Sequence, residues 1–249
     1  MRIPGADKAI ANLMKWSAKE DWRPYREQVF AEHFDLICDR FDISEEEIAD
    51  LLGETFGMLF GCVFEDFMAA RFDEGGEKNV VEDYLKRRGW REKVPAKRYL
   101  EAIKNSVLSL HEVVDLDPGP TMTVKDLILG GDPVTVDEKL GSESAVRWDR
   151  IAGRIVTVNR KNYFTGSMVL FPHEVADEVI SSINEILKNV KARLRREAKK
   201  SDEPFYYEET EARGMLLSSS AYLFTQAWLT DVLEQSSAPM PEIRNSDGD

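Results

Sequence analysis

Two aspartates, Asp115 and Asp117, lie two residues apart in the stretch VVDLDPGP. Side chains at i and i+2 of a β-strand point to the same side, and paired carboxylates suit a divalent metal ion. A complete site would need more ligands, and the spacing fits no EF-hand loop. An aspartate before Pro-Gly also suits a tight turn, because its carboxylate accepts backbone amides. We expect a structural turn here, with a metal-dependent enzyme as an alternative.

Motifs for other enzyme chemistry are not found in the sequence. The three histidines, His33, His111 and His173, show no metal-ligand spacing. No G-x-S-x-G nucleophile motif occurs, and the glycines of LGGDP are not followed by the lysine of a phosphate-binding loop. We therefore predict no catalytic residues and no cofactor, and we favour a binding protein over an enzyme.

Two clusters of positive charge stand out in an acidic chain. The formal net charge of -13 repels phosphate at long range and argues against indiscriminate binding to nucleic acid or anionic membranes. Residues 86–98 nevertheless hold seven basic residues against one acidic residue, and residues 188–200 do the same. The candidate contact residues are Lys86, Arg87, Arg88, Trp90, Arg91, Lys191, Arg193, Arg195 and Arg196.

These basic runs have three interpretations. Charge runs are usually solvated helix faces, and acidic helices between residues 42 and 83 could pair with them. If the runs meet beside the small β-barrel that we predict for residues 109–172, they form a groove for nucleic acid in which Trp90 stacks on bases. An acidic protein partner is the third. We take a non-enzymatic binding or regulatory module that contacts nucleic acid as the working hypothesis.

Gly53, Gly57 and Gly61 recur at intervals of four. The pattern predicts one helix that opens at a Ser44–Glu47 capping box and continues to about Phe72, with the glycines on one ridge. Each glycine costs about 1 kcal/mol against alanine in a helix, so close approach of a neighbouring helix is the expected compensation. That neighbour lies either inside the fold or in a homodimer, and the second case would make the chain a protein-interaction or dimerisation module. The apolar stretch is too short for a membrane span, and we expect no membrane contact.

The hydrophobic pattern predicts an α+β protein. Residues 1–108 form a helical region, and residues 109–172 hold five short strands in a small β-barrel or bent antiparallel sheet. Residues 173–235 form two helices that pack back on the N-terminal helices, the second from about residue 206 to 234. Residues 236–249 are a linker or the truncated start of a further segment.

The amino terminus and the cysteines indicate the compartment. Asp7, Lys8 and Lys15 interrupt every apolar run near the start, so a secretory signal is not indicated and a cytoplasmic location is expected. Cys38 and Cys62, each with apolar neighbours, fit buried free thiols better than a disulfide there.

Residues 84–171 resemble a set of uncharacterised bacterial proteins. The resemblance lies in the segment from YLKRRGW through LHEVVDLDPGPTMTV to DEK, followed by RWDRIAGRIV. It implies a helical region followed by a small β-barrel and a bacterial cytosolic setting, but no activity. Some longer members of that set end in a SEC-C zinc motif, and the closing IRNSDGD resembles the start of a further segment in them. The SEC-C cysteines are absent from this sequence, so no zinc site is carried over.

Overall fold

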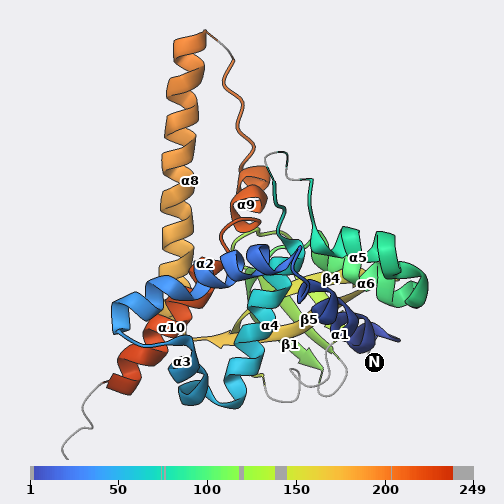
Figure 1. Ribbon diagram of the computed structural model, residues 1–249. Coiled ribbons are helices and arrows are strands. Elements are labelled where there is room, and N and C mark those ends of the chain that lie inside the picture. The colour runs from blue at the N-terminus through green and yellow to red at the C-terminus, as the bar shows by residue number, and fades with distance from the viewer. Residues whose placement is uncertain are drawn as a thin grey trace, which may run out of the picture.

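A computed structural model describes residues 3–73, 75, 77–117, 121–137, 145–202 and 204–237. The N-terminal half is helical, as predicted, and its helices surround one end and one face of the sheet (Figure 1). Asn79 begins one of these helices, because its side chain accepts hydrogen bonds from the amides of Val81 and Glu82. The elements are α1 (Ala6–Ser17), α2 (Arg23–Phe41), α3 (Glu45–Leu52), α4 (Glu54–Ala69), α5 (Val80–Arg88), the 3-10 turn η1 (Gly89–Arg91) and α6 (Val94–Lys104).

The prediction of a single helix from Ser44 to Phe72 is wrong, because the helix is interrupted at Gly53. Its φ of 55° lies in the left-handed region, so it ends α3 and begins α4. The predicted Ser44–Glu47 capping box is confirmed at the start of α3. The three glycines therefore form no common helical ridge.

The two glycines inside α4 have different surroundings. A Cβ atom at Gly61 would lie 2.0 Å from the hydroxyl oxygen of Ser167, whereas a Cβ at Gly57 would meet nothing within 4 Å. Of these two glycines, only Gly61 is closely approached by a neighbouring element, and that element is a strand of the barrel, not a helix.

The five predicted strands are confirmed and close into a barrel. The strand order is β1-β2-β3-β5-β4, and β4 pairs with β1 to close the ring. Neighbours pair antiparallel except for β3 and β5, which are parallel. A small cluster fills the interior, including Val124, Val136 and Phe164. The strands are β1 (Ser109–Asp117), β2 (Thr121–Asp126), β3 (Val134–Asp137), β4 (Arg150–Val158) and β5 (Lys161–Phe171).

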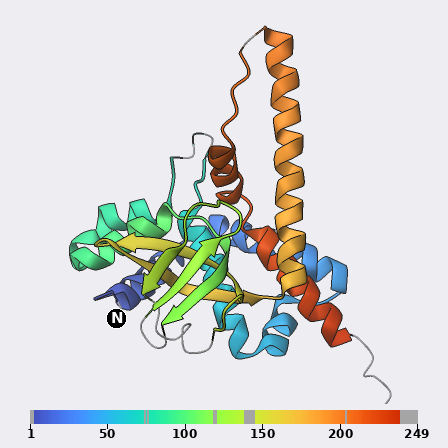
Figure 2. The ribbon, with the colours of Figure 1, turned by 180° about the vertical axis from the view of Figure 1, so that it is seen from behind.

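The C-terminal helices differ from their prediction in two ways. The second helix is not continuous: it divides into α9 (Glu209–Leu217) and α10 (Tyr222–Ser237), separated by a short turn. The first, α8 (His173–Ser201), has buried residues from Val175 to Leu187 and then projects away from the body (Figures 1 and 2). The residues after 237 lie outside the described part of the chain.

One hydrophobic core joins the helical region, the outer face of the barrel and the C-terminal helices. Leu13 of α1, Phe67 of α4, Leu100 of α6 and Phe224 of α10 belong to the same buried cluster. Helix α4 lies on β5, α6 on β4, and α10 on α2. Within the described residues, no helix is long and apolar enough to cross a membrane.

Candidate functional site

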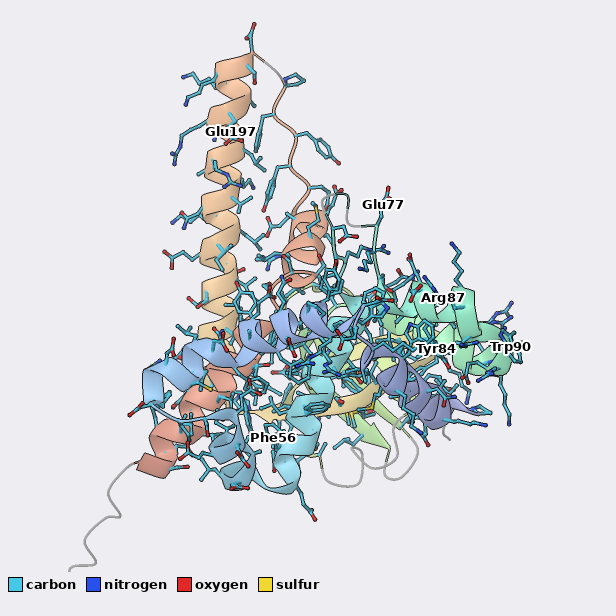
Figure 3. The ribbon with its side chains drawn as sticks, viewed as in Figure 1. Phe56, Glu77, Tyr84, Arg87, Trp90 and Glu197 are labelled. Atoms are coloured by element: carbon cyan, nitrogen blue, oxygen red, sulfur yellow. The ribbon has the colours of Figure 1, made fainter. Side chains whose placement is uncertain are left out.

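The structure places the two basic runs on different sides of the molecule. The first lies on α5, η1 and α6, and the second lies on the projecting part of α8. Figure 3 shows Arg87 and Trp90 at one side of the body and Glu197 near the tip of α8 on the other. The expectation that both runs meet in one groove is therefore wrong, because α8 carries its charges away from the barrel.

We call the first surface the Trp90 corner. It is defined by Lys86, Arg88, Trp90, Arg91 and Lys93, together with Lys19 from the turn that follows α1. The second surface has two parts. The α8 arm is residues 188–201, and the strap is the extended segment of residues 204–208 that returns beside the arm (Figure 1).

Buried polar side chains hold the Trp90 corner in place. The carboxylate of Glu92, which directly follows η1, is buried and accepts hydrogen bonds from Tyr84 (2.5 Å) and from Asn12 of α1 (2.8 Å). Burial, followed by the hydrogen bond to Glu92, raises the pKa of the Tyr84 hydroxyl. These contacts fix η1 between α1 and α5, and the ring of Trp90 is left 71% exposed.

Cations gather on the aromatic rings of this corner. The guanidinium of Arg91 lies 4.7 Å from the centre of the Trp90 ring. The ammonium of Lys19 lies 3.3 Å from the Trp16 ring, and the guanidinium of Arg88 lies 5.7 Å from the same ring. Lys19 was not among the predicted site residues, since it is far from the run in sequence and only the contact between α1 and α5 brings it there.

One carboxylate, Asp83, lies beneath these cations. It accepts hydrogen bonds from the indoles of Trp16 and Trp22 and forms an ion pair with Arg87 at 2.6 Å. Burial favours a higher pKa for Asp83, but the hydrogen bonds from Trp22, Arg87 and Trp16 outweigh it and lower the pKa. Arg87 is therefore neutralised locally. Among the described residues, no ion pair involves a basic residue of the Trp90 corner.

The α8 arm has a different construction. The last buried residue of α8 is Leu187, directly before the arm, and the helix continues to Ser201. On the strap, Tyr206 is 78% exposed and Phe205 is 40% exposed. Tyr207 stacks on Phe205, and the ammonium of Lys191 lies 4.6 Å from the Tyr207 ring. The sequence pattern does not predict this strap, because Tyr206 and Tyr207 fall at the start of the helix expected from about residue 206.

A polar cluster is buried between α4 and the barrel. Arg154 of β4 is 1% exposed and forms an ion pair with Asp66 at 2.6 Å. His33 contacts both Asp66 and Thr225, and Glu65 accepts a hydrogen bond from Thr165 at 2.6 Å. These groups join five elements, α2, α4, β4, β5 and α10, through the core, so their role is structural.

The pKa values of the two carboxyl groups in this cluster are shifted in opposite directions. Burial raises the pKa of Glu65 to about 7, against the hydrogen bond from Thr165 and the charge of Arg154. Burial also favours a higher pKa for Asp66, but the hydrogen bond from His33 and the charge of Arg154 outweigh it, and the pKa is lowered.

The predicted aspartate pair lies on the β1–β2 hairpin. Asp115 is exposed on β1, while the side chain of Asp117 and the residues 118–120 of the expected turn lie outside the described part. In the described residues, no group of three or more His, Cys, Asp or Glu side chains is placed to hold a metal ion. A metal site at this pair remains a prediction.

His111 and Asp126 are paired across the same hairpin, at the end away from its turn. The Nδ1 atom of His111 is 3.8 Å from an Asp126 carboxylate oxygen, and burial lowers the pKa of the imidazole. Asp126 accepts hydrogen bonds from Ser109 and from the amides of Ile128 and Leu129, so it organises the turn after β2. Because the imidazole is buried, this pair offers a substrate no direct access.

Comparison with known proteins gives a family but no activity. The model of a family of unknown function, DUF7986, matches residues 63–210, which is more than half of the chain. The searches of curated proteins and of solved structures found no match.

Proposed function

The chain belongs to this family of unknown function, and we propose from the geometry of the Trp90 corner that it is a non-enzymatic module that binds single-stranded nucleic acid. The supporting observation is the 71% exposed Trp90 among the cations Lys19, Arg88 and Arg91, which come from the turn after α1, from α5 and from η1. An indole face stacks on any base, and the neighbouring cations pair with phosphates.

The support beneath the corner favours binding over a merely solvated face. Tyr84, Asn12 and Glu92 fix the turn that presents Trp90, so little side-chain or backbone order has to be gained on binding. Arg91 beside the ring adds a cationic plane at the same point. A flat, single-stranded chain suits this surface better than a duplex, whose bases are already stacked.

The net charge of the whole molecule limits the affinity. Since the chain carries -13, long-range repulsion opposes the approach of a polyanion, and binding must come from the local contacts. With about four phosphate contacts, the logarithm of the binding constant should fall with a slope of about -3 against the logarithm of salt concentration.

Fluorescence anisotropy with a labelled ten-nucleotide single strand tests the proposal. Titrations at about 50 and about 200 mM salt give the slope of the logarithm of the binding constant against the logarithm of salt concentration. The variant Arg88→Glu with Arg91→Glu should weaken binding at least about tenfold and reduce the salt slope. The matched variant Arg195→Glu with Arg196→Glu makes the same change in net charge on the α8 arm and should leave binding unchanged. Neither pair includes Arg87, whose ion pair with Asp83 supports the fold.

Two results would overturn this function. The first is wild-type protein that fails to bind the single strand at the lower salt concentration. The second is an equal loss of binding in the two matched variants, which would show a response to net charge rather than to the Trp90 corner.

A further inference from the structure

The α8 arm extends well beyond the surface on which its helix begins. Fourteen residues follow the last buried one, Leu187, up to Ser201, and at 1.5 Å per residue they reach about 21 Å further. Both views of the ribbon show this part standing clear of the body with only the strap beside it (Figures 1 and 2). A helix of this length in water is marginal without tertiary packing.

The arm has the chemistry of a binding element. Leu194 is 38% exposed and lies among arginines, and the exposed rings of Phe205 and Tyr206 lie on the adjoining strap. In the described residues, the one ion pair of the arm joins Arg193 to Glu197 at 3.9 Å. The arm therefore offers apolar side chains surrounded by unneutralised positive charge.

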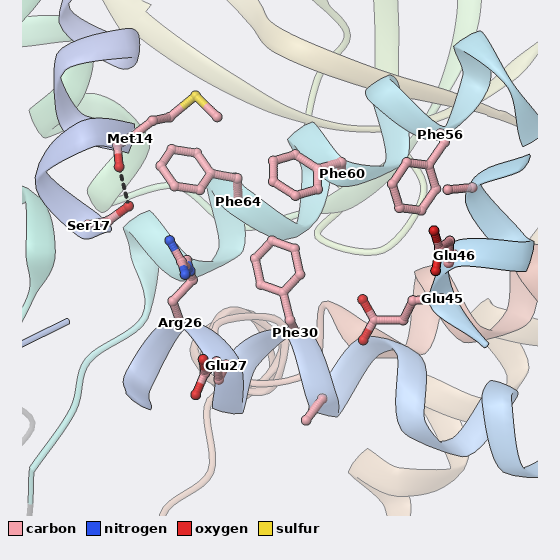
Figure 4. A pocket seen from close by; sticks show the side chains of 12 residues that line it. Met14, Ser17, Arg26, Glu27, Phe30, Glu45, Glu46, Phe56, Phe60 and Phe64 are labelled. Atoms are coloured by element: carbon pink, nitrogen blue, oxygen red, sulfur yellow. Dashed lines mark hydrogen bonds between the residues drawn. The ribbon is translucent and has the colours of Figure 1, made fainter. Parts of the chain in front are cut away.

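A groove on the body has the complementary chemistry. It has a volume of about 570 Å³ and lies between α1, α2, α3 and α4 (Figure 4). Phe30, Phe56, Phe60 and Phe64 line it, and the Phe30 and Phe60 rings are 5.1 Å apart. Aromatic side chains in a groove of this size are typical of binding sites for apolar groups.

The charges around this groove are mainly negative. Glu27, Glu45 and Glu46 line it together with one basic residue, Arg26. Figure 4 shows Glu45 and Glu46 at the end near Phe56, and Arg26 toward the end near Phe64. Glu27 is paired with Arg23, so Glu45 and Glu46 are the carboxylates available to a partner.

We propose that this groove binds the tip of the α8 arm of a second copy of the chain. The arm supplies apolar side chains and positive charge, and the groove supplies aromatic rings and negative charge. Because the straight helix carries the tip away from its own body (Figure 1), the occupant comes from another molecule. If two chains exchange their arms, two equal contacts form and the assembly closes as a dimer.

The first measurement is the molar mass of the full chain by light scattering. At about 50 μM and low salt, we expect twice the chain mass of 28.4 kDa, with a return toward one chain as salt screens the contact. A single-chain mass at this concentration would overturn the proposal and leave the groove to another kind of ligand.

A charge exchange identifies the contact. The arm variant Arg195→Glu with Arg196→Glu and the groove variant Glu45→Lys with Glu46→Lys should each raise the dimer dissociation constant by about tenfold or more, because like charges then face each other. Mixing the two variants should restore the dimer mass, because the acidic arm then meets the basic groove and the native arm meets the native groove. Circular dichroism confirms that each variant is folded before mixing.

The corner variant Lys86→Glu with Arg88→Glu is the matched control. It changes the charge as much as the arm variant does, and the dimer mass should persist. A dimer that survives both the arm and the groove variants, or two monomeric variants that do not recombine on mixing, would contradict the arm-to-groove contact. Binding of the short oligonucleotide is measured separately, so failure of this proposal leaves the proposed function standing.

Discussion

The Trp90 corner and the α8 arm come from basic runs of the same length and the same charge, each with seven basic residues in thirteen positions. The corner rests on buried residues of three helices and on the Glu92 hydrogen bonds. The arm begins after the last buried residue of α8, Leu187. A charge run in sequence therefore says little about its role, which depends on what lies beneath it: a fixed surface can bind without ordering, whereas an unsupported helix gains order from its partner.

The largest expected difference between the two regions is in stability. Leu100 is buried in α6 beneath the corner, and Leu194 lies 38% exposed on the arm. Leu100→Ala should lower the free energy of unfolding by about 2–5 kcal/mol, and Leu194→Ala by less than about 1 kcal/mol. Urea unfolding followed by circular dichroism, at a protein concentration low enough to keep the chain monomeric, measures both. Equal losses would mean that the arm belongs to the cooperative body.

The body and the arm should also respond differently to pH. Glu65 has a pKa of about 7 in the fold against an ordinary value of 4.5. The folded state therefore binds this proton more tightly, so its stabilising contribution is full below about pH 4.5 and is lost as the pH rises to about 7. The upper bound of this loss is about 3 kcal/mol.

The variant Glu65→Gln should remove this loss, so its unfolding free energy relative to wild type should rise by about 1–3 kcal/mol between pH 5 and pH 8. His111, whose pKa is lowered, acts in the opposite direction below pH 6.5, but the comparison with wild type cancels its effect. The arm variant Arg195→Glu with Arg196→Glu should run parallel to wild type over this range. Urea titrations at several pH values decide, and a Glu65→Gln curve parallel to wild type would refute the raised pKa.

The two exposed aromatic residues separate the regions in binding. Trp90→Ala should weaken binding of the ten-nucleotide strand by roughly 5- to 150-fold, the range for loss of one stacked base. Tyr206 on the strap is 78% exposed, slightly more than Trp90 at 71%, yet Tyr206→Ala should change this affinity by less than about twofold. Anisotropy at a single low salt concentration suffices. Similar losses in the two variants would mean that the nucleic acid contacts the strap as well as the corner. A loss with Tyr206→Ala alone would mean that it binds the arm and not the Trp90 corner.

The fold was predictable where the local pattern alone decides it. The five strands show short β-branched runs between turn signals, and the Ser44–Glu47 box marks a helix start by itself. The break at Gly53 was not predictable in this way, because the spacing of glycines does not reveal a positive φ. The apolar stripe of α8 continues to Leu194, so the pattern does not show that burial ends at Leu187.

The site was predictable in part for a related reason. Trp90 and the neighbouring cations are adjacent in sequence, so composition finds them. Lys19 joins them only because Trp16 packs near α5 and donates to Asp83, a contact between distant segments. The groove is likewise formed by residues from four helices, which only the tertiary structure brings together.

The smallest expected effect tests whether the corner uses the shape of its cations as well as their charge. Arg91→Lys keeps the charge but removes the guanidinium plane beside Trp90, so affinity for the single strand should fall by about two- to fivefold, the scale of one exposed cation–π contact. The salt slope should stay unchanged, because the number of positive charges is the same. Arg196→Lys on the arm is the matched control and should alter neither quantity. If Arg91→Lys instead reduced the slope without lowering the low-salt affinity, Arg91 would act through phosphate alone, and the ring beside it would have no part in binding.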